Sequence, residues 1–198
     1  MSAAGANARL LAAAAVLAVA VAIAQDEAAP PSAEAMMDKG VAAFSEGRHA
    51  EAARLFAGAA ALHPQGGKEG SARLMQAKAL AAMARFEDAI VVLDACLELS
   101  PSAREAYEAL MLRGKSLIAA SATTPHFHEA AVSFSMAMET DGISRQSRTD
   151  AALHLIDALL RMGDRANATK TARRLGDQSA LRERAAELGL LRLAKARL

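Results

Sequence analysis

The side chains best suited to metal chemistry lie together after residue 125. His126, His128 and Glu129 offer two imidazoles and a carboxylate, which are donors used by many zinc sites. On a helix, residues two apart point about 200° away from each other, so the two histidines do not share a face. We therefore expect no metal site and exposed histidines at the start of a helix. A small-ligand or metal-binding helical enzyme or sensor built on these residues is the less favoured alternative.

Nucleophilic and phosphate-binding chemistry finds no support in the spacing of the residues. Cys96, the single cysteine, falls at a small apolar position of a helical pattern, so we expect a packed and protonated thiol. Residues 66–68 read Gly-Gly-Lys but lack the spacing and the preceding strand of a phosphate-binding loop. His49, His63 and His154 are isolated and are expected at turns or edges. We predict no catalytic residue and no cofactor.

The first 24 residues have the composition of an export signal. Arg9 gives a positive start, and residues 10–24 contain only Ala, Val, Leu and Ile. Such a helix spans about 22 Å, less than the roughly 30 Å of a bilayer core. Small residues at Ala22 and Ala24 predict a signal peptide (1–24) cleaved after Ala24, followed by a linker (25–33). No cysteine follows the apolar run to receive a lipid, and an uncleaved anchor formed by residues 10–24 is the alternative.

The composition of the chain favours helices. Of 198 residues, 53% are hydrophobic, 23% are charged and only 3% are aromatic, with no Trp. Alanine, leucine and methionine dominate, and all three favour helices over strands. We predict one all-α domain.

Small residues recur at a fixed interval along the chain. Gly40, Ala77 and Gly114 are 37 residues apart, and Ala52 and Ala89 are also 37 apart. Each unit is patterned as two amphipathic helices joined by a turn. The landmarks are Gly40, Ala52, Phe56, Ala59 and Pro64 in the first unit, Ala77, Ala89 and Pro101 in the second, Gly114, Ala130, Phe134 and Ala137 in the third, and Gly163 and Ala168 in the fourth.

These units resemble the tetratricopeptide repeat (TPR) over roughly residues 34–176. The first unit matches best, although Met36 and Ala43 replace the usual tryptophan and tyrosine. In the fourth unit Ile156 and Ala172 stand where a small residue and an aromatic are usual, so this unit is TPR-like or a plain helical hairpin. The resemblance implies a right-handed superhelical solenoid of antiparallel helix pairs over residues 34–198, with about four repeats and a C-terminal helix.

Residues without bulk let the two helices of a hairpin approach closely, and larger ones fill the gap to the next hairpin. No hairpin is expected to fold alone. The ends of the helices agree, since Ser102 and Glu105 have the spacing of a capping box, and Thr124 before Pro125 suits a helix start.

The resemblance also implies where a partner binds, because TPR proteins contact ligands through the first helix of each pair. The corresponding residues are Met37, Val41, Phe44, Leu74, Lys78, Met111, Lys115 and Ile118. They describe an apolar groove with two lysines, suited to an extended or helical peptide that carries a carboxylate. The alternative is that Phe44 and Ile118 pack against the next repeat and only the lysines are exposed.

Charge is divided between the two parts of the chain that follows residue 24. Residues 25–142 carry 10 basic and 16 acidic side chains, whereas residues 143–198 carry 12 and 6. A basic C-terminal helix suggests an anionic partner, and no nucleic-acid binding is expected from a neutral chain with few aromatics. The basic residues concerned are Arg173, Arg174, Arg182, Arg184, Arg192, Lys195 and Arg197.

Together these patterns predict an exported TPR-like scaffold that binds proteins in a bacterial periplasm or cell envelope, and that is not an enzyme. The alternative is a membrane-anchored assembly factor of the envelope. Fold alone does not decide between them.

Overall fold

The computed structural model describes residues 32–62, 67–120, 124–176 and 183–185. Every regular element in these ranges is a helix. The elements are α2 (Ala33–Ser45), α3 (His49–Leu62), α4 (Gly67–Ala82), α5 (Phe86–Glu98), α6 (Ala103–Ala120), α7 (Thr124–Glu139), α8 (Arg145–Arg161) and α9 (Arg165–Leu175).

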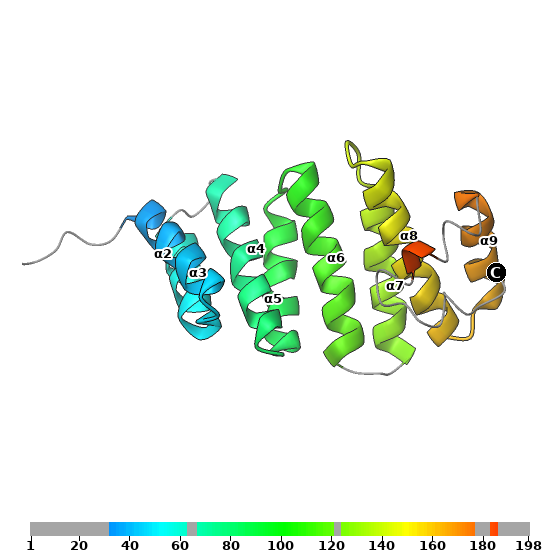
Figure 1. Ribbon diagram of the computed structural model, residues 1–198, viewed down its shortest axis with the longest axis horizontal. Coiled ribbons are helices and arrows are strands. Elements are labelled where there is room, and N and C mark those ends of the chain that lie inside the picture. Colours follow the sequence, from blue (N-terminus) through cyan, green and yellow to red (C-terminus); the bar gives the residue numbers. More distant parts are fainter. Residues whose placement is uncertain (1–31, 63–66, 121–123, 177–182, 186–198) are drawn as a thin grey trace, which may run out of the picture. The chain divides into compact units, whose positions relative to one another are not determined.

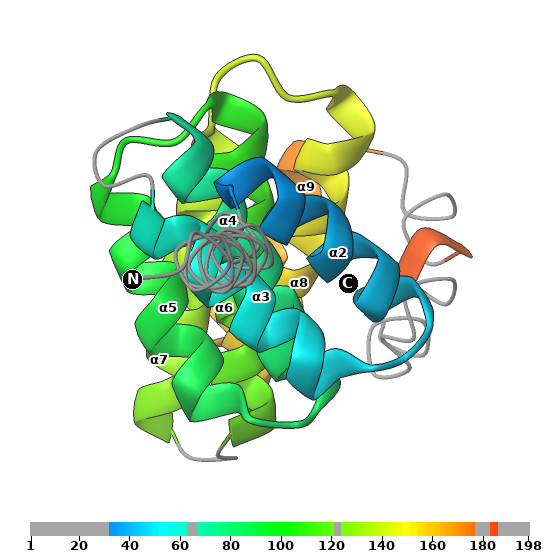
Figure 2. The ribbon, with the colours of Figure 1, turned by 90° about the vertical axis from the view of Figure 1, so that its left-hand side faces the viewer.

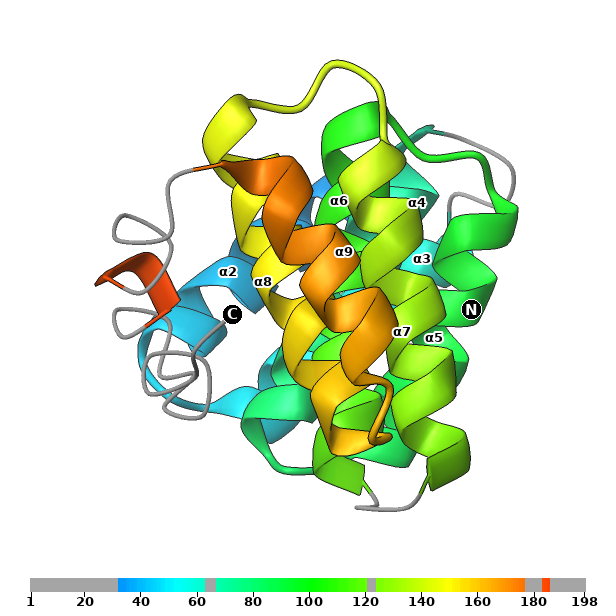
Figure 3. The same cartoon turned by 90° about the vertical axis from the view of Figure 1, so that its right-hand side faces the viewer.

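The helices of the unit that begins at Ala33 are stacked in chain order (Figure 1). Each helix from α2 to α8 packs against the next one, and α4 also contacts α6. The end-on views show α2 at one end of this stack and α9 at the other (Figures 2 and 3). Four antiparallel pairs result, α2 with α3, α4 with α5, α6 with α7 and α8 with α9, and the predicted TPR-like all-α architecture is confirmed.

Glycine allows the closest approach of helices in two of the pairs. A Cβ atom built on Gly40 would lie 2.6 Å from Cε1 of Phe56, and one built on Gly114 would lie 2.5 Å from Cε1 of Phe134. Both phenylalanines are fully buried. The glycine on the first helix therefore provides the space that the phenylalanine ring of the second helix occupies.

In the other two pairs, different combinations of side chains fill the space between the two helices. In α4 and α5 the corresponding residues, Ala77 and Leu93, are fully buried in one core cluster. In α8 and α9 they are Ile156 and Ala172, buried together in another cluster. The fourth pair thus places its larger residue on the first helix, which explains why its sequence departs from the repeat pattern.

The turns within the first and second pairs share one hydrogen-bond pattern. The amide of Arg48 donates to the carbonyl of Ala43, and the amide of Arg85 donates to that of Leu80. The residue before each donor has a left-handed backbone, with φ of 77° at Gly47. This is the Schellman motif that commonly ends a helix.

The predicted capping box at the start of α6 is confirmed. The amide of Ser102 donates to Oε2 of Glu105 at 3.1 Å, and the amide of Glu105 donates to Oγ of Ser102 at 3.4 Å. Helix α7 begins at Thr124, one residue before Pro125, where the sequence predicted the first helical residue.

Several expectations lie outside the described residues. These are the signal peptide with its cleavage site, the linker as far as residue 31, His63, Pro64 and the basic residues Arg182, Arg192, Lys195 and Arg197. Within the described part of the chain, no helix has the length and apolar character needed to cross a bilayer.

Candidate functional site

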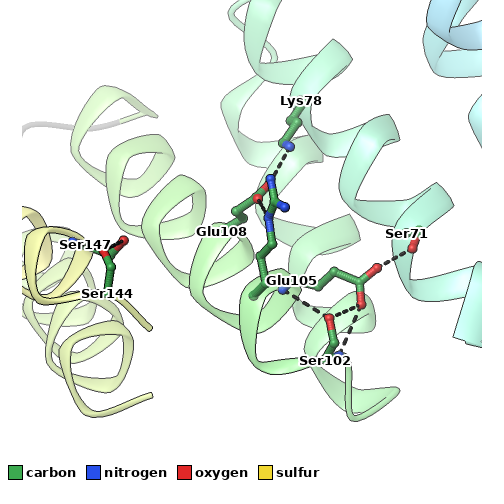
Figure 4. Close-up of polar contacts among 8 residues, drawn as sticks. Ser71, Lys78, Ser102, Glu105, Glu108, Ser144 and Ser147 are labelled. Atoms are coloured by element: carbon green, nitrogen blue, oxygen red, sulfur yellow. Dashed lines mark hydrogen bonds and ion pairs between the residues drawn. The ribbon is translucent and has the colours of Figure 1, made fainter. Parts of the chain in front are cut away.

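Polar contacts join the first helices of the second and third pairs. Nζ of Lys78 on α4 lies 2.6 Å from Oε2 of Glu108 on α6, and the hydroxyl of Ser71 donates to Glu105 (Figure 4). The hydrogen bond from Ser71 is the main cause that lowers the pKa of Glu105. Burial acts to raise the pKa of Glu108, but hydrogen bonds from Lys78 and Arg104 lower it overall. Both carboxylates are therefore held in the charged form.

The first helix of the fourth pair is joined to α6 in a similar way. The hydroxyl of Tyr107 donates to the carbonyl of Ser147 at 3.0 Å. Burial raises the pKa of this hydroxyl, so it remains a donor at neutral pH. Helices α4, α6 and α8 consequently form a continuous face held together by side chains.

A pocket of about 230 Å³ opens on this face. This volume is below the range that is usual for pockets that bind drug-sized ligands. A pocket of this size can hold one or two side chains of a peptide. Apolar atoms dominate its surface, and charged groups stand around them. The lining residues are Lys78, Tyr107, Glu108, Met111, Leu112, Lys115, Asp150 and His154.

Most charges of the pocket are already paired. Glu108 pairs with Lys78, and Asp150 accepts two hydrogen bonds of 2.7 Å from Arg184. The ammonium of Lys115 makes no ion pair within the described parts of the chain. Burial lowers the pKa of Lys115, and nearby Asp150 opposes that shift. Lys115 remains exposed to solvent, so its charge is available to a ligand.

His154 forms part of the wall of this pocket and was wrongly expected at a turn or edge. It lies within α8, is 8% exposed and stacks on Phe134 with ring centroids 5.2 Å apart. Burial lowers its pKa to about 4, and the charge of Lys115 adds to this effect. The imidazole is therefore neutral at pH 7, and its Nε2 atom is buried with no hydrogen-bond partner in the described structure.

The eight predicted groove residues are distributed over several surroundings. Lys78, Met111 and Lys115 line the pocket together. Met37 contributes to a separate hollow between α2 and α4, and Val41 is exposed. The others belong to or pack against the core clusters, namely Leu74, Phe44 and Ile118. Ligand binding by these residues stays a prediction.

Sequence reasoning missed Tyr107, Asp150 and His154. The repeat gave no signal for His154, because in the register that aligns Ile156 with Gly114 it corresponds to Leu112 and Met75, which are only partly buried. No signal marks Asp150 either, because its role depends on a contact with Arg184 across 34 residues.

The residues weighed for metal and thiol chemistry have other surroundings. His128 and Glu129 are exposed, and the described residues include no group of three potential metal ligands. Cys96 is fully buried in α5, where its thiol donates to the carbonyl of Gly70 at 3.3 Å. Burial raises the pKa of this thiol, so it is protonated at neutral pH.

Four stacked helix pairs with a pocket on their first helices define a helical-repeat protein of the TPR-like class. The model of the YfiO family, described as an outer membrane lipoprotein, matches residues 30–136, from before α2 into α7. The chain belongs to this family. A comparison with curated proteins finds no match. The description names a lipoprotein, whereas the single cysteine of the sequence is the buried Cys96.

Proposed function

We propose that the chain is an exported scaffold of the cell envelope that binds a segment of a partner protein in the pocket on α4, α6 and α8. The family to which it belongs supports an envelope location and a binding role. The helical-repeat fold supports the same reading, because stacked pairs offer one continuous face to an extended or helical peptide.

The surroundings of Lys115 are the main support for this proposal. Its ammonium is the one cation of the pocket without an ion-pair partner in the described structure, and Met111 and Leu112 lie beside it. A hydrogen bond to a charged group contributes about 1.5–3 kcal/mol. The pocket therefore suits a segment in which a carboxylate follows or precedes an apolar side chain.

The test begins with twelve-residue peptides selected from a random library on the intact protein. Their affinities are then compared between the wild type and Lys115→Gln. We expect the selected peptides to carry a carboxylate and to bind the variant at least tenfold more weakly, because the loss of a charge-assisted contact has that size.

Lys39→Gln provides the matched control, since Lys39 is an exposed lysine of α2 that makes no ion pair in the described structure. It should leave the affinity unchanged. Lys78 is less suitable, because its replacement also breaks the pair with Glu108. Equal affinities for the wild type and Lys115→Gln would overturn the proposed site.

The proposal includes export by the N-terminal segment with cleavage after Ala24. Intact mass measurement of protein isolated from producing cells tests it. A chain that begins at Gln25 supports cleavage, and a chain that retains Met1 supports an anchor formed by residues 10–24.

A further inference from the structure

The outer face of α9 carries positive charges that the described structure leaves uncompensated. Arg165, Lys170, Arg173 and Arg174 are all exposed, and none of them makes an ion pair within the described ranges. They extend over about 14 Å of the helix axis. Figure 3 looks directly onto this helix, which no other described helix covers on that side.

In two other helices an arginine is balanced by a carboxylate one turn earlier. Arg73 pairs with Glu69 in α4, and Arg161 pairs with Asp157 in α8. Helix α9 contains no acidic residue at all. Its N-cap residue, Asp164, is engaged by the amide and side chain of Asn167. The concentration of like charge is thus a property of α9 and not of the whole surface.

The charged face is a shallow surface that is open to solvent, with Thr169 among the cations. It is formed by Arg165, Ala166, Thr169, Lys170, Arg173 and Arg174.

The composition of this face narrows the class of ligand. The described exposed side chains of α9 include no large apolar residue that could insert into a bilayer. The helix also lacks an aromatic residue on which a nucleic-acid base could stack. Arginine forks match carboxylates in two-point contacts, so an acidic polypeptide remains the ligand best matched to this face.

We propose that α9 is a second docking surface, which binds an acidic segment of a protein partner through Arg165, Lys170, Arg173 and Arg174. Charge complementarity over three helical turns supplies the attraction. This helix lies beyond residues 30–136, the part matched by the family model. The proposal is independent of the pocket on α4, α6 and α8, because none of the residues that line the pocket belongs to α9.

The probe for the test is a fluorescein-labelled peptide of twelve residues with glutamate at positions 1, 5 and 9 and alanine or glutamine elsewhere. Its binding to the full chain is measured by fluorescence anisotropy at two salt concentrations. We expect Arg173→Gln with Arg174→Gln to weaken binding at least tenfold and to reduce the dependence on salt. Circular dichroism checks that the variant remains folded.

The matched control replaces two exposed arginines elsewhere, Arg54→Gln with Arg145→Gln, which changes the net charge equally. It should bind the probe like the wild type, and so should Lys115→Gln, which separates this surface from the pocket. Equal loss in both double variants would overturn the proposal, since attraction would then follow net charge alone. Binding of anionic phosphatidylglycerol vesicles without binding of the peptide would also overturn it.

Discussion

Gly114 and Phe134 offer the sharpest residue-scale test of how the helices of a pair pack. Gly114→Ala should lower the free energy of unfolding by about 1–2 kcal/mol, because the new Cβ would lie 2.5 Å from a buried ring. His154 stacks on the same ring, so a displacement of the ring would also disturb this contact. Urea unfolding followed by circular dichroism measures the change.

Gly70→Ala is the control for this substitution. A Cβ at Gly70 would meet nothing closer than 3.9 Å, so alanine should stabilise the helix by about 0.5–1 kcal/mol. The double variant Gly114→Ala with Phe134→Leu copies the pair found at Ala77 and Leu93, and it should recover part of the loss. If Gly114→Ala were as stable as Gly70→Ala, the packing described would be wrong.

His154 predicts how stability depends on pH. Lys115 and Asp150 face it from α6 and α8, and Phe134 covers it from α7. Its folded pKa of about 4 lies below the ordinary 6.5, so the unfolded chain takes up a proton first as pH falls. The stabilisation is complete above pH 6.5 and is lost as pH falls towards 4.

The expected loss between pH 7 and pH 5 is about 2 kcal/mol from this residue alone. The comparison is between the wild type and His154→Gln in urea at both pH values. The wild type should lose about 2 kcal/mol more than the variant over this interval. An identical loss in the two proteins would mean that His154 is not buried as a neutral group.

The role of a single residue can be predicted from the sequence where the residue recurs at a fixed position of the repeat. It cannot be predicted where the role depends on a contact between side chains of different helices. The small residues Gly40 and Gly114 were identified because small residues recur at the same position in the first three units. Neither the pairing of Lys78 with Glu108 nor that of Asp150 with Arg184 could be predicted, because each depends on how neighbouring pairs are rotated against one another.

At the scale of the elements, the turn after α4 departs from its counterpart. Ala84 occupies the position of Gly47 one repeat later and has φ of 56°, a left-handed conformation that is unfavourable for alanine. Ala84→Gly should therefore raise the free energy of unfolding by about 0.5–1 kcal/mol, despite the greater freedom of glycine in the unfolded chain. Thermal and urea unfolding both report this change.

Ala42→Gly serves as the comparison, since Ala42 is an exposed residue within α2. The same replacement there should destabilise by about 0.5–1 kcal/mol. Destabilisation by both substitutions would show that the turn at Ala84 is not left-handed.

Helices as elements were predictable because alanine and leucine favour them and because the amphipathic pattern is regular. The capping box at Ser102 also followed from its spacing. The fourth pair was ambiguous, since Ile156 and Ala172 exchange the large and small positions of the earlier pairs. The structure shows that both side chains are buried in one core cluster. The large residue on α8 and the small residue on α9 together fill the space between the two helices, as the small and large residues do in the earlier pairs.

At the scale of the described stack, the links between pairs follow the same period as the sequence. Glu34 pairs with Lys68, and Ser71 bonds Glu105, so both residues of the second contact lie 37 positions after those of the first. The first, second and third pairs therefore share one contact at equivalent positions of their first helices. The link from α6 to α8 differs, because Tyr107 and Ser147 make it.

We propose that a partner segment occupies the face formed by α4, α6 and α8. Nuclear magnetic resonance of the isotope-labelled protein, titrated with a peptide selected on it, tests this directly. The largest chemical-shift changes are expected at Lys78, Met111, Lys115 and His154. Shifts confined to the exposed apolar residues of α5 and α7, Val91, Val132 and Met136, would contradict it.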